Sequence, residues 1–354
     1  LATAAALSGH KPNGRSHTMS RERIVSANHQ PEDTAGEPTG PSIRPKTLDD
    51  YIGQSQLQTR LRIAMTAAKS RQEPTEHLLL HGPPGLGKTT IAHIVAEEMG
   101  TKAYVTSGPA LTKGADLVGT LTRMQPGDIL FIDEIHRLPA AVEEYVYPAM
   151  EDFKIDFTLD AGMHARVVTY RLQPFTLIGA TTRAGLLTAA LRSRFGIAHR
   201  LDFYDPSELE QILARASQVL NLNPPDPAAL TLIASRSRGT PRVALRLLRR
   251  VRDFAQVHQA QCITTELADE ALRLEGVDEQ GLDDLDRAYL KVIRDVYEGG
   301  PAGLEAIAAT LGEDAGTLED VVEPYLLQIG LLARTRQGRQ LTSGGQTSLP
   351  LLDA

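Results

Sequence analysis

One stretch of eight residues constrains the fold more than any other part of this 354-residue chain. Residues 82–89 read GPPGLGKT and satisfy the pattern G-x-x-x-x-G-K-[ST] in full. A short apolar run at 78–80 precedes them, and a stretch of helical character at 90–99 follows. A glycine-rich loop between a strand and a helix lets backbone N–H groups surround phosphate oxygens, while the helix N-terminus faces the same anion. The sequence therefore predicts a phosphate-binding loop in an α/β domain.

The residues of this loop have separate chemical tasks. Gly85 and Gly87 allow the backbone to bend closely around the phosphates. Lys88 supplies positive charge to the β- and γ-phosphates, and the Thr89 hydroxyl is a ligand for Mg²⁺. Thr90 begins the expected helix and is counted with the nucleotide-binding residues. The loop therefore predicts ATP and Mg²⁺ as ligands.

A second apolar run, residues 129–132, ends in two carboxylates. Asp133 would hold the metal ion, usually through water, and Glu134 would polarise the attacking water. Strands that are apolar throughout and are separated by helices are typical of a parallel sheet covered on both faces. The expected fold is thus a P-loop domain of the α/β class with a parallel sheet.

A third apolar run, residues 176–180, ends at Thr181 and Thr182. A polar side chain at this edge of the sheet can touch the γ-phosphate or orient water. We favour Thr182 over Thr181 for this role. Ordinary capping of the strand is the alternative.

Three arginines further along the chain are candidates for sensing or neutralising the nucleotide. Arg192 and Arg194 follow a short helical segment, and an arginine that reaches a neighbouring subunit's γ-phosphate would neutralise charge in the transition state. We favour Arg194. Arg242 follows Thr240 and Pro241, which are good helix-start residues, and would point from a separate lid toward the nucleotide. A surface ion pair is the alternative for Arg192 and Arg194, and an arginine on the lid surface is the alternative for Arg242.

Composition and periodicity divide the chain into four parts. Residues 1–40 lack apolar periodicity and are expected to be a disordered extension, with Met19 favoured as the natural start. Residues 41–203 alternate strand and helix and form the large ATPase domain. Residues 204–275 are helical throughout and form a small lid. Residues 277–354 combine three short helices with a hairpin, the order of a winged-helix head domain that would bind DNA.

The charges of this last part predict how it would bind DNA. It carries fourteen acidic and six basic residues. Its third helix, expected at 317–328, holds only acidic charges, so it would not read bases in the manner of a recognition helix. The hairpin would instead touch the DNA backbone, which positions a protein without specifying sequence, through Arg334, Arg336 and Arg339. The tail after Thr342 is expected to be loose.

Overall composition excludes several classes of protein. The net charge of −7 does not by itself indicate nucleic-acid binding. One cysteine, Cys262, excludes an intramolecular disulfide framework, and it is expected to be buried. No apolar run reaches the ~20 residues of a membrane-spanning helix. A cytoplasmic protein without membrane contact is expected.

The motifs together resemble the AAA+ class of ATPases, and several strings resemble the RuvB family within it. The resemblance extends from about Arg44 to Arg339. The strings are GPPGLGKTT (82–90), LFIDEIHRL (130–138), YPAMEDF (147–153), LIGATTRAG (177–185), SRFGI (193–197), RGTPR (238–242) and RRVRDFAQV (249–257).

The resemblance implies an ATP-driven DNA translocase that moves Holliday junctions during recombination and repair. It also implies that the chain works as a homo-oligomeric ring, expected to be a hexamer. It implies double-stranded DNA arms, a RuvA-like junction-binding protein and a RuvC-like resolvase as partners. It also assigns the arginine finger to Arg194 and a second sensor to Arg242. Further nucleotide contacts are implied for segments around the adenine and at the subunit boundary: Ile43, Arg44, Tyr51, Ile52, Tyr204, Glu151, Asp152 and Phe153.

One more hairpin is indicated between the second and third predicted strands. Apolar residues alternate at Ile155, Phe157 and Leu159, then come a turn at 160–162 and a second strand at 167–172. In RuvB-like proteins such a hairpin docks the RuvA partner. A hairpin packed against its own domain is the alternative.

Two other functions share some of these features. A clamp loader or replication-initiation switch has the same phosphate-binding loop and arginine motif, but the RuvB-like strings argue against it. A sequence-specific transcription regulator with an ATPase module requires a basic recognition helix, and the acidic residues in 317–328 argue against that.

Overall fold

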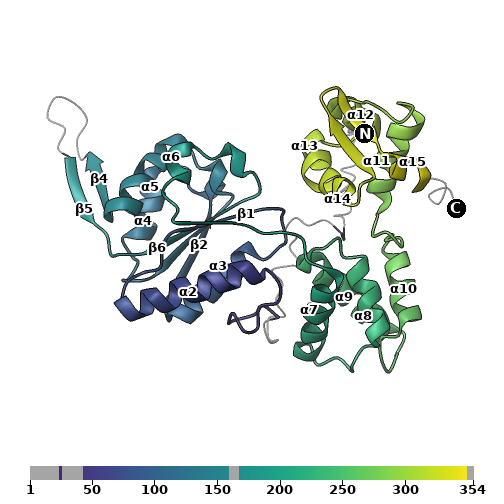
Figure 1. The fold of residues 1–354 in the computed structure, drawn as a ribbon, viewed down its shortest axis with the longest axis horizontal. Helices are drawn as coiled ribbons and strands as arrows, with labels where there is room; N and C mark the ends of the chain where they lie inside the picture. Colours follow the sequence, from purple (N-terminus) through teal and green to yellow (C-terminus); the bar gives the residue numbers. More distant parts are fainter. Residues whose placement is uncertain (1–23, 26–42, 159–166, 349–354) are drawn as a thin grey trace, which may run out of the picture.

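A computed structural model describes residues 24–25, 43–158 and 167–348, and it separates into an α/β part, a helical part and a mixed part (Figure 1). None of the helices in these ranges is long and apolar enough to cross a membrane.

The α/β part is built on a five-stranded sheet of order β2-β3-β6-β1-β7, in which every neighbouring pair is parallel. This confirms the predicted fold class. The three apolar runs form its centre, whereas the two edge strands had no clear signal because half of their residues face outward. The strands are β1 (Leu78–His81), β2 (Ala103–Ser107), β3 (Ile129–Asp133), β6 (Thr176–Thr181) and β7 (Ile197–Arg200).

Helices cover both faces of this sheet, as the alternating burial of β1 requires. Leu78 and Leu80 pack into one core cluster, and Leu79 packs into the other. In Figure 1, α2 and α3 lie on one side of the sheet, and α4, α5 and α6 lie on the other. Their bounds are α2 (Ser55–Arg71), α3 (Lys88–Met99), α4 (Gly114–Leu121), α5 (Ala140–Asp152) and α6 (Ala189–Arg192), with 3₁₀ turns at Gly108–Ala110, Ile135–Arg137 and Ala184–Leu186.

The predicted hairpin between the second and third runs is confirmed and projects from the α/β part (Figure 1). β4 (Lys154–Thr158) pairs antiparallel with β5 (Val167–Arg171). The predicted turn at 160–162, and Leu159 with it, lies outside the described residues.

The helical part consists of four helices: α7 (Pro206–Val219), α8 (Pro227–Ser235), α9 (Pro241–Val257) and α10 (Thr265–Leu274). Proline occupies the first turn of three of them, where its missing N–H costs nothing. Cys262, which was expected to be buried, is exposed instead. It lies between α9 and α10, in a connection that contributes little to the core.

The mixed part has the order expected of a winged helix. Its elements are α11 (Asp284–Asp295), α12 (Leu304–Leu311), α13 (Ala315–Thr317), a π-helical turn (Leu318–Val322), α14 (Glu323–Gln328), β8 (Leu332–Thr335), β9 (Gly338–Leu341) and α15 (Ser343–Ser348).

Two details of this part differ from the expectation. The third helix is not continuous but changes to π geometry before Pro324, whose missing N–H interrupts the regular hydrogen-bond ladder. Residues 343–348 of the tail, which was expected to be loose, form α15, and the rest of the tail lies outside the described residues. Thr342 starts this helix, because its hydroxyl accepts from Gly345 N at 3.0 Å and its carbonyl accepts from Gln346 N at 3.0 Å.

Candidate active site

The phosphate-binding loop lies between β1 and α3, as predicted. Gly82 and Gly87 have φ values of 138° and 98°, which side-chain-bearing residues rarely adopt. A Cβ atom on Gly82 would also lie 2.5 Å from the Leu201 carbonyl oxygen. The two glycines therefore set the shape of the loop, and α3 begins directly after it at Lys88.

Lys88 is buried at the centre of this loop. Its Nζ donates to the carbonyl oxygens of Gly82 at 2.8 Å and Pro83 at 2.7 Å. Burial lowers the pKa of Lys88 to about 8, although Asp133 and Glu134 act in the opposite direction. An anion beside this ammonium would relieve the cost of burying it, so the loop is built to receive negative charge.

Glu134 directly follows β3 and contacts Thr182, which directly follows β6, the third predicted strand. The Thr182 hydroxyl donates to Glu134 Oε2 at 3.3 Å, and Glu134 N donates to Asp133 Oδ1 at 2.9 Å. Both carboxylates are close enough to Lys88 to affect its pKa. The structure thus gathers Lys88, Asp133, Glu134 and Thr182 at one edge of the sheet, with Thr89 next to Lys88 on α3.

Two tyrosines join the loop to the helical part. The hydroxyls of Tyr51 and Tyr204 lie 2.8 Å apart, and Tyr204 also donates to the Leu86 carbonyl oxygen at 3.3 Å. Burial raises the pKa of Tyr51 to about 12. The Ile43 carbonyl oxygen accepts from Arg215 Nη1 of α7 at 2.9 Å. These contacts bring Ile43, Tyr51 and Tyr204 to the boundary between the two parts, and Ile52 follows Tyr51 there.

Arg242 approaches the loop from the helical part. Its backbone N donates to the Gly85 carbonyl oxygen at 3.4 Å, and its charge contributes to lowering the pKa of Lys88. Arg242 is the second residue of α9, which begins at Pro241 after the buried Thr240. The start of this helix therefore meets the phosphate-binding loop.

Arg194 lies in a separate cluster. Its Nε is 3.2 Å from Glu151 Oε1, its Nη1 donates to the Ala190 carbonyl oxygen at 2.5 Å, and its guanidinium lies 4.4 Å from the Tyr147 ring centroid. Asp152 pairs with Lys154 at 2.7 Å. In the part of the chain that the structure describes, none of these contacts involves the phosphate-binding loop of the same chain.

Phe153 belongs neither to the residues around the phosphate-binding loop nor to the cluster around Arg194. Its ring packs edge-on against Phe175, with 5.8 Å between centroids, and lies 6.4 Å from the His77 ring. Its φ of 49° marks the point where α5 ends and β4 begins. Phe153 therefore acts structurally at the base of the hairpin.

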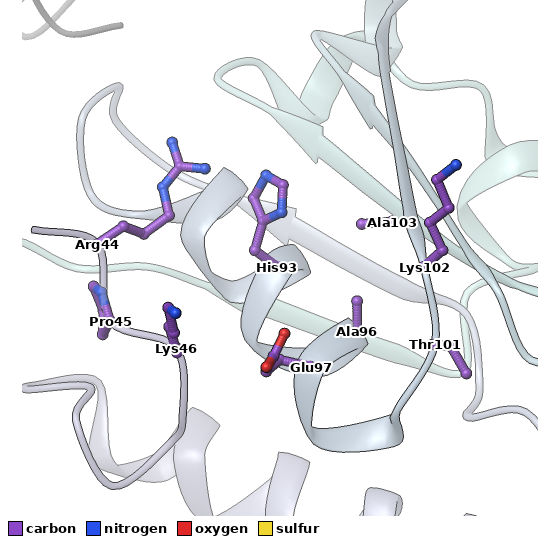
Figure 2. Close-up of a pocket in the computed structure, with 9 residues that line it drawn as sticks. All are labelled: Arg44, Pro45, Lys46, His93, Ala96, Glu97, Thr101, Lys102 and Ala103. Carbon is purple, nitrogen blue, oxygen red and sulfur yellow. The ribbon is translucent and has the colours of Figure 1, made fainter. Parts of the chain in front are cut away.

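Arg44 lines a pocket on the side of α3, with a volume of about 410 Å³. Figure 2 shows Arg44 and Lys46 on the chain before α2, His93 and Glu97 on α3, and Lys102 at the start of β2. None of the loop residues 82–89 lines this pocket. The Arg44 side chain, which was predicted to lie near the adenine, thus lines a pocket that the phosphate-binding loop does not share.

The wing arginines are largely occupied within their own domain. Glu323 is fully buried, and its two carboxylate oxygens accept from Arg334 Nε at 2.6 Å and Arg339 Nε at 2.9 Å. Tyr289 also donates to Glu323 at 2.9 Å. Of the three predicted DNA-contacting arginines, Arg336 alone is exposed without an ion pair to another described residue.

The acidic residues of the third helix contact the α/β part. Arg183, next to Thr182, forms ion pairs with Asp320 and with Glu319, the latter at 3.6 Å. These side chains are about half exposed. A second junction is buried: Arg238 pairs with Asp286, and the two side chains are 4% and 0% exposed.

Three residues at these contacts escaped the sequence analysis: His136, Arg183 and Glu323. His136 Nδ1 lies 3.2 Å from Glu134 Oε2 and 2.8 Å from Thr181 Oγ1. A histidine two residues after the second carboxylate was the available signal. No local signal existed for Arg183 and Glu323, since their partners are distant in the sequence.

A parallel sheet with a phosphate-binding loop, paired strand-end carboxylates and a helical lid that reaches back to the loop define a P-loop ATPase of the AAA+ class. Family models agree over nearly the whole chain. The model for the P-loop domain of the Holliday junction DNA helicase RuvB matches residues 43–201, that for the RuvB AAA lid domain matches 204–278, and that for the RuvB C-terminal winged-helix domain matches 279–350. The chain belongs to the RuvB family, and with it to the ATP-hydrolysing enzymes.

Relatives and solved structures support this membership. The Holliday junction branch migration complex subunit RuvB of Desulfosudis oleivorans is 55% identical over 91% of this chain and 93% of its own. The protein of the same name from Kosmotoga olearia is 54% identical over 88% and 91%. The structure of the Thermotoga maritima RuvB Holliday junction branch migration motor superposes with a TM-score of 0.79, at 50% identity over 87% of this chain and 98% of that one. Membership excludes the clamp-loader and transcription-regulator alternatives.

Proposed function

We propose that this chain is the motor subunit of a branch migration complex, and that it uses ATP hydrolysis to move duplex DNA at a Holliday junction. The observation that carries the proposal is the convergence of Lys88, Asp133, Glu134 and Thr182 at one sheet edge, in a chain that also has a lid and a winged helix. The proposed domains are 41–203, 204–275 and 277–354, after an extension at 1–40.

In this proposal Lys88 binds the β- and γ-phosphates and the N–H groups of Gly85 and Gly87 surround them. The Thr89 hydroxyl and, through water, Asp133 would hold Mg²⁺, because oxygen ligands suit this cation and it retains several waters. When bound, Mg²⁺ would neutralise charge on the phosphates. Glu134 polarises the attacking water, and Thr182 keeps its carboxylate in place through the contact at 3.3 Å.

Around the adenine we propose Ile43, Tyr51, Ile52 and Tyr204, which lie where the lid meets the large domain. The backbone of Arg44 belongs to the same segment. Arg242 would report the presence of the γ-phosphate to the lid, since α9 starts against the loop. Thr90 follows the loop on α3 and completes this set.

We further propose a homo-oligomeric ring, as a hexamer, in which Arg194 completes the neighbouring subunit's site. Support comes from the position of Arg194 and Glu151, which gather on a surface that contributes nothing to their own chain's loop. Asp152 and Phe153 would adjoin the same boundary.

DNA contact is proposed at the wing, with Arg336 as the leading residue. Arg334 and Arg339 would contribute less to DNA binding, because both are already paired with Glu323. The other partners are proposed to be a RuvA-like protein and, in the complete machinery, a RuvC-like resolvase, in the cytoplasm.

The β4–β5 hairpin is the proposed contact for the RuvA-like protein. Ile155 is fully buried, so it anchors the hairpin and does not face a partner. The apolar side chains with exposed surface are Val168 and Tyr170 of β5, 42% and 44% exposed. Phe157 and Leu159, proposed from the sequence, belong to the same hairpin, but the structure describes neither side chain.

The test is branch migration of a synthetic four-way junction with RuvA and ATP, with hydrolysis measured in parallel. We expect Arg194→Ala to abolish both activities in the assembled ring, while the exposed neighbour Arg192→Ala, a matched control, keeps them. If the wild-type protein hydrolyses ATP but never moves a junction, the motor proposal is wrong. Equal losses in the two variants would remove the special role of Arg194.

A further inference from the structure

His136 is a nearly buried side chain beside the proposed catalytic carboxylate. The side chain is 7% exposed. Its Nδ1 is 3.2 Å from Glu134 Oε2 and 2.8 Å from Thr181 Oγ1. The imidazole therefore bridges the ends of β3 and β6, the two strands that carry the polar residues of the site.

The backbone around Glu134 creates this contact. Glu134 has a φ of 48°, in the left-handed region that few non-glycine residues occupy. The chain then forms the 3₁₀ turn, in which Arg137 N donates to the Glu134 carbonyl oxygen at 2.9 Å. As a result His136, two residues further on, lies against the side chain of Glu134.

Close packing fixes this turn. Ile135 is 1% exposed and lies over Gly179 of β6, where an added Cβ would come within 2.9 Å of Ile135 Cδ1. A left-handed residue at a functional site persists only when its surroundings hold it. The position of His136 is thus determined by the sheet and not by a free surface loop.

The direction of the hydrogen bonds follows from elementary valence. An ionised carboxylate can only accept, so a favourable contact with Glu134 needs the tautomer in which Nδ1 carries the proton. That single N–H is then shared between Thr181 Oγ1 at 2.8 Å and Glu134 Oε2 at 3.2 Å. Thr181 Oγ1 already accepts from Arg183 N at 3.0 Å and can accept from Nδ1 as well. Thr182 donates to the same Glu134 oxygen, Oε2, at 3.3 Å. Two donors therefore meet at Oε2 and leave Oε1 to accept from water.

We propose that His136 is a positioning residue for ATP hydrolysis. Its Nδ1–H bonds Thr181 Oγ1 on the neighbouring strand and at the same time faces Glu134 Oε2 at 3.2 Å, which keeps that carboxylate in place. The inference rests on the proposed role of Glu134. His136 itself touches neither nucleotide nor attacking water. Its effect falls on the turnover number and not on the affinity for ATP, because Lys88 and the glycines of the loop bind the phosphates without it.

The test compares His136→Leu, His136→Asn and Glu134→Gln in the full chain. Leucine fills the space without a donor, whereas the asparagine amide nitrogen stands close to the place of Nδ1. Measured quantities are kcat and KM for ATP and the Kd for a fluorescent non-hydrolysable ATP analogue. Thermal unfolding of each variant checks that it folds.

We expect His136→Leu to lower kcat by about 10- to 100-fold, the range for groups that orient a functional ligand, with Kd within about twofold of wild type. His136→Asn should recover at least about fivefold of that loss, since a donor returns. A kcat for His136→Leu within twofold of wild type overturns the inference. So does an equal loss of kcat in the two histidine variants, which would indicate packing alone.

Glu134→Gln distinguishes a failure of the proposed role of Glu134 from a failure of the proposed role of His136. If this variant retains full hydrolysis, the proposed role of Glu134 fails first, and the inference about His136 fails with it. If Glu134→Gln is inactive while His136→Leu is normal, only the inference about His136 is wrong.

Discussion

The buried pair between Arg238 and Asp286 should be the most costly ion pair to break in this chain. Arg238 lies between α8 and α9 of the lid, and Asp286 lies in α11 of the winged helix; their side chains are 4% and 0% exposed. We consider Asp286→Asn, which removes the negative charge but keeps an oxygen that can accept from Asp283 N, as Asp286 does at 3.0 Å. The substitution leaves the Arg238 charge buried without its counter-ion.

Removing one member of a buried ion pair costs about 3–5 kcal/mol. The lower end applies here, because Arg238 retains the Gly281 carbonyl oxygen at 2.8 Å and the Tyr325 ring at 4.7 Å. With a urea dependence of roughly 2 kcal/mol per M, a loss of about 3 kcal/mol lowers the transition midpoint by about 1.5 M. Circular dichroism of the full chain in urea measures this midpoint for the lid and winged helix.

A matched control is Asp320→Ala. Its pair with Arg183 also joins two domains, but both side chains are about half exposed, and such pairs contribute at most about 1 kcal/mol. The midpoint should change by less than about 0.5 M. The reasoning is refuted if Asp286→Asn moves the midpoint no further than Asp320→Ala does. Replacing both partners, as in Arg238→Met with Asp286→Leu, should restore most of the stability.

Three further predictions follow from single contacts. Lys88→Ala should weaken ATP binding by at least about 100-fold in equilibrium titration, because a charged donor to phosphate is lost. Glu323→Gln should free the wing arginines and make DNA affinity higher and its salt dependence steeper by about one counterion, as measured by fluorescence anisotropy at several salt concentrations. His77 accepts from Leu177 N at 2.8 Å, and burial lowers its pKa below the ordinary 6.5. The unfolded chain therefore binds a proton below about pH 6.5 that the folded chain does not, so stability falls as pH drops below that value, and His77→Gln should reduce this slope in urea titrations.

Local signals in the sequence were sufficient for the centre of the fold and for the core of the site. Residues 82–89 predicted the loop, because a strand, its glycines and the following helix are contiguous. The apolar runs at 129–132 and 176–180 predicted where the polar strand ends would meet, because parallel strands end at one edge of a sheet. The edge strands β2 and β7 were missed, since partly exposed strands lack a continuous apolar run.

Contacts between distant residues could not be predicted in the same way. Arg334 and Arg339 were read as free cations, yet a buried carboxylate 11 and 16 residues earlier in the sequence pairs with both. Ile155 was proposed with Phe157 and Leu159 for partner contact, with packing against its own domain as the alternative, and the domain buries Ile155. In each case the pattern gave the element correctly, and tertiary packing decided which side of it was free.

The acidic third helix also has a consequence for how the domains respond to their solvent. Glu319 lies within 4 Å of three arginines, Arg183 of the large domain and Arg334 and Arg339 of the wing, at 3.6, 3.8 and 3.6 Å. Its carboxylate thus pairs with two of the arginines for which DNA contact is proposed. If DNA binds the wing as proposed, its phosphates would compete with the Glu319 carboxylate for Arg334 and Arg339. Exposed ion pairs such as these weaken as salt is added, whereas the buried pair of Arg238 with Asp286 is screened much less. Ionic strength therefore loosens the contact of the acidic helix with the large domain more than it loosens the junction between the lid and the winged helix.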